Sequence, residues 1–142
     1  METNTVICSG GLFLAKDTRR FLFLQRTHKK TAGTWGLVGG KKESSDTTLV
    51  DTLYREISEE LGERPIEKII PLELFTNSDQ SFQYNTYILI TPEEFVPQLN
   101  SEHSGYAWVK FDNWPKPLHR GVKNSLGNKI NNIKLNLLLE LL

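Results

Sequence analysis

The sequence is poor in cysteine and has no surplus of charge of either sign. Cys8 is the only cysteine among the 142 residues, so neither an intrachain disulfide nor a zinc site built from several cysteines can form. Lys and Arg together number 17, Asp and Glu also number 17, and the formal net charge is zero. This balance argues against general nucleic-acid binding, because proteins that coat nucleic acid need a basic surplus. It leaves room for a local basic pocket that holds one phosphorylated small molecule.

Long hydrophobic segments are also missing. No apolar stretch approaches the ~20 residues that cross a membrane, and the Leu-rich end "IKLNLLLELL" is short and carries Lys134 and Glu140. The start, "METNTVICSGG", lacks the basic residues and the long apolar stretch of a signal peptide. We therefore expect a soluble, cytoplasmic protein without a membrane partner. Cys8 lies in an apolar run and is expected to be buried filler.

The length and the apolar pattern predict a single domain, residues 1–142, that mixes strands and helices. Strands are expected at "TVICSGGLFLA", "FLFLQR", "KIIPLELFT", "FQYNTYILI" and "YAWVKF", with a short extended piece at 35–38. A short helix is expected at "TPEEF". From about residue 118 the chain is expected to be mostly helical, with interruptions near Gly121 and Gly127. This C-terminal segment would either cap the domain or build a homodimer.

The strongest helical pattern runs from about residue 49 to residue 61. Thr48 is expected to be its N-cap, with Asp51 as the capping-box partner, and Gly62 is expected to be its C-cap. An apolar stripe recurs every four residues, at Leu49, Leu53, Ile57 and Leu61. The helix must therefore pack on another element.

Three carboxylates, Glu56, Glu59 and Glu60, share one face of this helix. Like charges at that spacing repel one another and destabilise a helix slightly. An acidic helix face is most often a solvated surface, but here a turn with paired glycines, ending at Gly40, precedes the helix. Hard cations such as Mg²⁺ bind to a few carboxylates together with substrate phosphates, and a bound cation would neutralise the cluster. The pattern therefore favours a metal site.

The stretch "GGKKESSDTTLVDTLYREISEELGE" resembles the signature of the Nudix hydrolase family, G-x5-E-x7-R-E-U-x-E-E-x-G-U, in which U is bulky and apolar. The positions that match are Gly40, Arg55, Glu56, Ile57, Glu59, Glu60 and Gly62. "GTWGLVGGKKE" and "FLFLQR" are similar to the segments that precede the signature in that family. The resemblance implies an α/β fold, a three-layer α/β/α sandwich with a mixed sheet.

The chain departs from the signature before the helix. The spacing from Gly40 to Arg55 is one residue longer, and the first glutamate of the signature is missing, with Asp46 or Thr47 in its place. In the family that glutamate pairs with the arginine that Arg55 matches. Either Asp46 takes over this pairing, or Arg55 pairs with Glu59 one turn further on. Glu63 replaces the terminal apolar residue, which we interpret as a small packing change.

The resemblance also implies roles for individual residues. Glu56 and Glu60 would hold Mg²⁺, for which Mn²⁺ could substitute, with Glu59 sharing the ion or orienting the water and the Gly40 carbonyl as a further ligand. Arg55 belongs to the same catalytic motif. Two nearby cations, Arg26 and Lys41, are candidates to bind substrate phosphates, as is the neighbouring Lys42, although exposed cations also serve solubility.

A second stretch, "SEHSGYAWV", is similar to a phrase in family members that cleave dinucleoside polyphosphates and to a related phrase in GDP-mannose hydrolases. Glu102 is therefore a candidate for water activation or for a link to the metal. His103 is expected to be structural or close to the substrate, because a single histidine lacks ligand partners. His119 is a weaker candidate for a site histidine. No role is assigned to the aromatic residues Phe75, Phe82 and Tyr84.

These observations predict a Mg²⁺-dependent pyrophosphohydrolase that cleaves a nucleoside diphosphate linked to another moiety X. A dinucleoside polyphosphate or a nucleoside diphosphate sugar is favoured over a nucleoside triphosphate. The alternative is a catalytically silent module of the same fold that binds nucleotide or RNA. Silent members would be expected to lose signature carboxylates, whereas this chain keeps all three of those in the helix.

Overall fold

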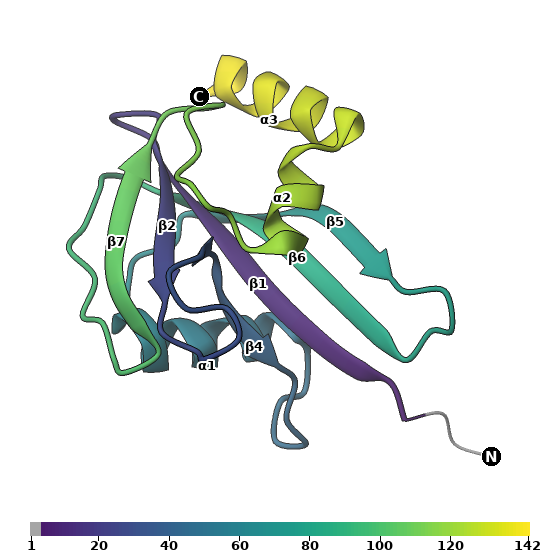
Figure 1. Cartoon of the computed structure of the whole chain (residues 1–142). Helices are drawn as coiled ribbons and strands as arrows, with labels where there is room; N and C mark the ends of the chain where they lie inside the picture. The colour runs from purple at the N-terminus through teal and green to yellow at the C-terminus, as the bar shows by residue number, and fades with distance from the viewer. Residues whose placement is uncertain (1–3) are drawn as a thin grey trace.

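A computed structural model describes residues 4–142 as a mixed sheet with helices on both faces (Figure 1). The strands are β1 (Val6–Ala15), β2 (Phe21–Arg26), β3 (Trp35–Gly36), β4 (Val38–Lys41), β5 (Lys68–Thr76), β6 (Phe82–Thr91) and β7 (His103–Val109). The helices are α1 (Leu49–Leu61), α2 (Arg120–Leu126) and α3 (Lys129–Leu141). The first residues of the chain, on which the expected lack of a signal peptide partly rests, lie outside the described part.

Strand β1 is the centre of the sheet. Its whole length pairs in parallel with β6, which pairs in turn with β5 in antiparallel fashion. On the other side of β1, β4 pairs antiparallel with its first half and β2 pairs antiparallel near its end. Strand β2 also pairs with β3 and β7. The sheet is therefore mixed, as predicted, and its strand order is β3-β2-β1-β6-β5 with β4 and β7 as branches.

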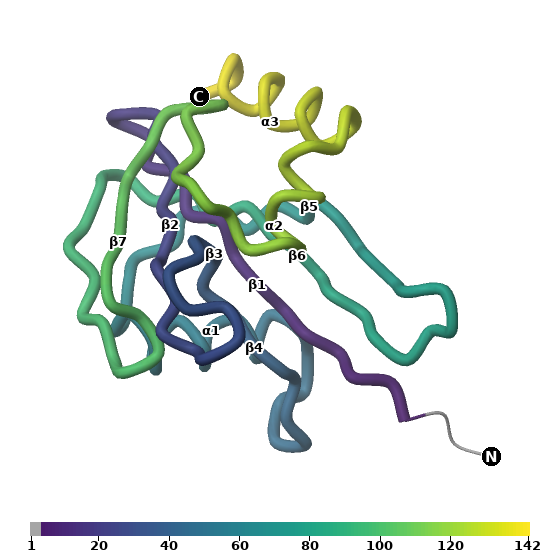
Figure 2. Tube along the Cα trace, in the orientation of Figure 1, coloured from purple at the N-terminus to yellow at the C-terminus, as the bar shows by residue number. Residues whose placement is uncertain are grey.

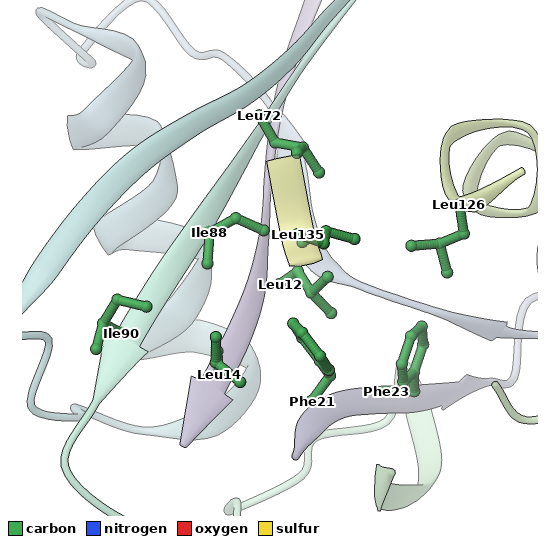
Figure 3. Close-up of a cluster of buried hydrophobic side chains, with 9 residues drawn as sticks. All are labelled: Leu12, Leu14, Phe21, Phe23, Leu72, Ile88, Ile90, Leu126 and Leu135. Carbon is green, nitrogen blue, oxygen red and sulfur yellow. The ribbon is translucent and has the colours of Figure 1, made fainter. Parts of the chain in front are cut away.

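Alternation along the strands divides the apolar side chains between two cores, because successive residues of a strand point to opposite faces. On one face of the sheet, strand side chains pack with Leu126 of α2 and Leu135 of α3, and the strands contribute Leu12, Leu14, Phe21, Phe23, Leu72, Ile88 and Ile90 (Figure 3). On the other face, the strand side chains pack with Leu53, Ile57 and Leu61 of α1, and the strands contribute Phe13, Leu22, Leu24, Val38 and Leu89. The result is the α/β/α sandwich that the sequence predicts, with α3 as a cap on one layer.

Helix α1 begins and ends as predicted. The Thr48 hydroxyl accepts from the Asp51 amide, the Asp51 carboxylate accepts from the Thr48 amide, and Gly62 caps the C-terminus with a positive φ of 81°. Three of the four residues in the apolar stripe are buried, and Leu49 is half-buried. This firm attachment to the sheet sets the positions of the carboxylates on the neighbouring face of the helix.

The helix expected at "TPEEF" does not form. Thr91 completes β6 opposite Ala15, and the Arg20 guanidinium binds both oxygens of Glu94, at 2.7 and 2.9 Å. The ring of Phe95 packs edge-on against Phe13 and Trp108. The signals of a helix start were present, but tertiary contacts hold this segment in an irregular conformation.

Three smaller expectations also need correction. Gly121 lies inside the first turn of α2, so it does not interrupt the helix, whereas Gly127 does separate α2 from α3. The extended piece at 35–38 is two short strands, β3 and β4, that pair with different partners. Cys8 is half-buried in β1 rather than enclosed in a core.

Among residues 4–142, no helix is both long enough and apolar enough to cross a membrane.

Candidate active site

A hollow of about 240 Å³ lies where the acidic face of α1 meets the end of β2 and the start of β7. It is lined by Arg26, Thr27, His28, Gly39, Glu60, Ser101, Glu102 and His103. The loop after β2 and the turn before β7 lie side by side (Figure 2), and the Thr27 amide donates to the Glu102 carbonyl at 3.1 Å. The fold thus joins the acidic helix to the "SEHSGYAWV" segment.

Glu60 is the most deeply placed carboxylate of the hollow. Its side chain is only 2% exposed, and one of its oxygens accepts a hydrogen bond from the Gly39 amide at 3.1 Å. Its other oxygen lies 3.5 Å from Nδ1 of His103. Glu60 therefore faces the hollow from α1 with its orientation fixed by β4.

His103 and Glu102 approach Glu60 from the other side. A register irregularity between Gln25 and Arg26 brings His103 opposite Arg26 on β2. Ligand atoms of Glu60, Glu102 and His103 lie within 4.8 Å of one another. His103 is buried, and its Nδ1 has no hydrogen-bond partner among the described residues. The expectation that this histidine lacks ligand partners is therefore wrong, because two carboxylates adjoin it.

Gly40 and Glu56 lie close to each other, and Glu56 lies beside Glu60. Gly40 pairs with Ser9 of β1, and any side chain at Gly40 would collide with the Glu56 carboxylate. The missing side chain therefore lets the backbone of β4 approach Glu56 closely. The role of both residues as metal ligands stays a prediction.

The electrostatics of the hollow favour a counter-charge. Burial, followed by the proximity of Glu56 and Glu102, raises the pKa of Glu60 to about 9. Burial, with a smaller effect of the Arg26 charge, lowers the pKa of His103 to about 4, so its imidazole is neutral at pH 7. A buried carboxylate of this kind must bind either a proton or a cation.

The donor set fits a divalent cation. Carboxylate oxygens suit Mg²⁺ and Mn²⁺, and a neutral imidazole with a free ring nitrogen is also a competent ligand. The unpartnered Nδ1 of His103 and the raised pKa of Glu60 are the features that a cation would satisfy. The residues able to hold it are Glu56, Glu60, Glu102, His103 and the Gly40 backbone.

Arg55 is held by Asp46. Its Nε and Nη2 atoms donate to the two Asp46 oxygens, at 3.1 and 2.8 Å, and Asp46 also accepts from the hydroxyl of Thr52. Arg55 contacts Glu56 at 3.0 Å and lies 3.6 Å from Glu59. Of the open alternatives, Asp46 therefore takes the place of the missing signature glutamate in this pairing, while the longer contact to Glu59 coexists with it.

The remaining predicted residues are spread around the hollow. Arg26 lines it, and its Nε donates to the Thr31 hydroxyl at 2.9 Å. Glu59 has a side chain that is 56% exposed and is absent from the group of close ligand atoms. Lys41 is exposed and contributes its carbonyl to Arg55 at 2.9 Å. The close group of ligand atoms therefore consists of Glu60, Glu102 and His103, and Glu56 adjoins it beside Glu60. Glu59 and Lys41 belong neither to this group nor to the lining of the hollow.

A second, larger cavity of about 400 Å³ lies on the other face of the sheet, against α2. Its lining includes Phe75, Phe82, Tyr84 and His119, and Arg26 borders both cavities. Sequence reasoning assigned no role to the three aromatic residues. Phe82 and Tyr84 are two residues apart in β6, and Phe75 of β5 pairs with Tyr84, so the three side chains share one face of the sheet. Only the packing of α2 shows that this face is partly open.

His119 is the N-cap of α2. Its Nδ1 accepts from the Gly121 amide at 3.2 Å, and its own amide donates to the Trp35 carbonyl at 2.8 Å. Burial, with a smaller effect of the Arg26 charge, lowers its pKa. His119 therefore borders the larger cavity and does not belong to the cluster around Glu60.

Solved structures of similar fold come from several organisms. A MutT Nudix hydrolase from Burkholderia pseudomallei has a TM-score of 0.67 and 22% identity over 88% of this chain and 98% of that chain. The Nudix domain of Shewanella oneidensis NrtR, complexed with ADP ribose, has a TM-score of 0.72 and 18% identity over 94% and 88%. An Ap4A hydrolase from C. elegans has a TM-score of 0.65 and 19% identity over 95% and 99%. At these identities the likeness establishes the fold.

The sequence itself supplies the evidence of family. No curated protein matches the chain, but the family model described as the NUDIX domain matches residues 8–126. That match covers most of the chain and includes the acidic helix together with Glu102 and His103. The chain belongs to the Nudix family of hydrolases, which act on phosphoric anhydride bonds.

Proposed function

We propose that this protein is a divalent-cation-dependent pyrophosphohydrolase that cleaves a nucleoside diphosphate linked to a further moiety X. The observation that carries the proposal is the convergence of Glu60, Glu102 and His103 within 4.8 Å, in a hollow bordered by Arg26. Such a cluster can bind a cation in place of a proton, and the diphosphate of a substrate needs a counter-charge too. A cation between them satisfies both.

The cation would be held by Glu56 and Glu60, with the Gly40 carbonyl, Glu102 and His103 available to complete its shell. When bound, Mg²⁺ or Mn²⁺ would screen the diphosphate and make a water molecule more acidic. Gly39 keeps the Glu60 carboxylate in place through its amide. Asp46 keeps Arg55 against Glu56 and thereby fixes the direction of that carboxylate.

Glu102 is the favoured group to accept a proton from the attacking water. It is exposed and lies at the mouth of the hollow, whereas Glu60 is enclosed. A base must reach the water and also release the proton afterwards, which suits a carboxylate with access to solvent. Glu59 is the alternative, although its position beside Arg55 favours an orienting role.

Arg26 connects the hollow with the larger cavity on the other face. A substrate with its diphosphate near Arg26 would have one end at the carboxylates and the other in an aromatic pocket. The volume of about 400 Å³ is in the range of small-ligand sites. This arrangement favours substrates with a large group on one side of the diphosphate, such as dinucleoside polyphosphates and nucleoside diphosphate sugars.

A substrate panel tests the proposal. Diadenosine tetraphosphate, GDP-mannose, ADP-ribose, GTP and ATP are each incubated with Mg²⁺, with Mn²⁺ and with EDTA, and the products are identified by mass. We expect cation-dependent cleavage of an anhydride bond, abolished by Glu60→Gln and retained by the matched surface variant Glu63→Gln. Binding without turnover in every arm would instead indicate the silent module.

A further inference from the structure

The larger cavity contains one carboxylate, that of Glu73, in a wall that is otherwise mainly apolar and aromatic. The lining includes Leu12, Leu37, Leu72, Phe75, Phe82, Tyr84, Val122 and Leu126. Glu73 has no basic partner within 4.0 Å among residues 4–142, and Lys134 donates to the preceding carbonyl, of Leu72, instead. A charge in such a place needs several hydrogen-bond donors.

A bulge in β5 directs Glu73 into this cavity. Pro71 pairs with Tyr87 and Glu73 with Thr86, so Leu72 is an extra residue in the ladder. In a regular strand two neighbours would point to opposite faces, but here both Leu72 and Glu73 line the cavity. Bulges commonly redirect a side chain in this way.

Two helices hold the carboxylate of Glu73 in one orientation. One oxygen accepts from the Ser125 hydroxyl at 2.6 Å, and the other accepts from the Asn131 amide group at 2.9 Å. Asn131 is 2% exposed and also donates to the Ser125 carbonyl. These bonds tie α2 and α3 to the sheet, which is a structural role. They use one acceptor position on each oxygen, and an ionised carboxylate has about four in all.

The aromatic wall suits a planar ring. The rings of Phe75 and Phe82 are 6.4 Å apart between centroids, as are those of Phe82 and Tyr84. The Tyr84 hydroxyl rests against β1 at Gly10, where a side chain would collide with it. Phe75 is half exposed, at 50%, and so remains free to cover a ligand. Stacking of this kind accepts any base, so it cannot by itself select one.

Selection would come from the free acceptor positions of Glu73. A base edge with two adjacent N–H donors can bind both oxygens of a carboxylate at once. Guanine has such an edge in its ring N1–H and its 2-amino group, and pterins carry the same 2-amino-4-oxopyrimidine edge. Adenine presents a ring acceptor beside its amino group, uracil presents an N–H between two acceptors, and hypoxanthine lacks the amino group.

We propose that the cavity between β5, β6 and α2 binds the base of the substrate, and that Glu73 selects a 2-amino-4-oxopyrimidine edge, as in guanine or a pterin. This inference rests on the proposed function for the statement that the bound molecule is the substrate. Its core, a selective ring-binding site built around a fixed carboxylate, concerns binding alone. The two can therefore fail separately.

Binding measured without catalysis provides the test. Calorimetry with GMP, IMP, AMP and free pterin is done in EDTA, so that hydrolysis plays no part. We expect GMP to bind about 10-fold or more tighter than IMP and AMP, on the scale of one bidentate base contact. The comparison of GMP with pterin shows which of the two ring systems, guanine or pterin, the cavity prefers. Equal affinity of the wild-type protein for GMP, IMP and AMP would overturn the inference.

Three variants identify the group responsible. Glu73→Gln keeps the size of the side chain but puts a donor where the edge needs an acceptor, so the preference for GMP over IMP should disappear. Phe75→Ala should weaken the binding of GMP, IMP and AMP by similar factors and leave the ratios of their affinities unchanged. Glu93→Gln, an exposed position outside the cavity, is the matched control. A Glu73→Gln protein that keeps the wild-type melting temperature and the wild-type GMP-to-IMP ratio would also overturn the inference. If the wild-type protein hydrolyses no substrate of the panel but still prefers GMP over IMP and AMP, only the proposed function is contradicted.

Discussion

Glu60 is the side chain on which the proposed cation site depends most. It is buried, lies next to Glu56 and Glu102, and accepts from the backbone amide of Gly39. Glu60→Gln keeps the shape and the amide contact but removes the negative charge that would bind the cation. We expect kcat to fall by at least about 10², the scale for one positioned catalytic group. Near-normal turnover at saturating Mg²⁺ would contradict this role.

His103 makes a second prediction at the scale of the residue. Its buried Nδ1 faces Glu60 at 3.5 Å without a hydrogen bond, and its lowered pKa keeps the ring neutral at pH 7. With Mn²⁺ bound, pulsed electron paramagnetic resonance should detect coupling to a ring ¹⁴N nucleus. His103→Gln should remove that coupling. The exposed His28 of the same hollow provides the control, because His28→Gln should leave the signal intact. A wild-type protein without nitrogen coupling would show that the cation has oxygen ligands only.

The contact between the loop 42–48 and α1 belongs to the scale of the element. Asp46 joins the loop to Arg55 and Thr52. Its pKa is lowered by the Arg55 hydrogen bonds first and then by the Glu43 amide. A carboxyl whose folded pKa lies below its unfolded value stabilises the fold above that unfolded value, and the stabilisation is lost as the pH falls.

Asp46→Asn should therefore lower the melting temperature at pH 7, and its difference from the wild type should shrink as the pH falls below about 4. For activity, Asp46→Ala should cost less than Arg55→Ala, and the double variant should cost less than the sum of the two, because the residues share one contact. Thermal unfolding between pH 3 and 7 and a double-mutant cycle on kcat/KM provide the measurements. Additive losses would show that the two residues act independently.

The limits of prediction from sequence also appear at this scale. Helix α1 was predicted closely because its cap signals and apolar stripe are local, and Asp46 was among the predicted partners of Arg55. The segment at 91–95 carried local helix signals too, yet contacts of Glu94 and Phe95 with distant residues decide its conformation. Glu73 could not be found from sequence, because its direction depends on a bulge that only the pairing of β5 with β6 creates.

The cluster around Glu60 could be predicted only in part for the same reason. The carboxylates of α1 are recognisable from spacing along one helix, and Glu102 from its resemblance to a known phrase. The sequence alone does not bring His103 together with Glu60, because the two residues are 43 positions apart. The pairing of β2 with β7 supplies the missing neighbour.

At the scale of the whole molecule, the sheet separates two hollows with different chemistry. Carboxylates gather on the α1 side, and aromatic rings gather on the side of α2 and α3, with Arg26 at the border of both. Each face also has its own apolar core. Helix α3 caps one of these cores with Leu135 and leaves Ile130, Ile133, Leu137 and Leu141 exposed. A homodimer through this helix stays a prediction that sedimentation can test.

Stability of the whole fold should depend on pH through Glu60, with a sign opposite to that of Asp46. Its folded pKa of about 9 lies above the ordinary value of 4.5 for a glutamate, so the metal-free folded protein binds a proton that the unfolded chain has released. Its stability should therefore decrease as the pH rises from about 5 to 9. A divalent cation binds the ionised form and opposes the loss, so the rise in melting temperature on addition of Mg²⁺ should grow with pH. Thermal unfolding in EDTA and in Mg²⁺ at pH 6, 7, 8 and 9 measures both trends, and Glu60→Gln should flatten them. A Mg²⁺ effect that is constant with pH in the wild type would mean that cation binding does not displace the proton of Glu60.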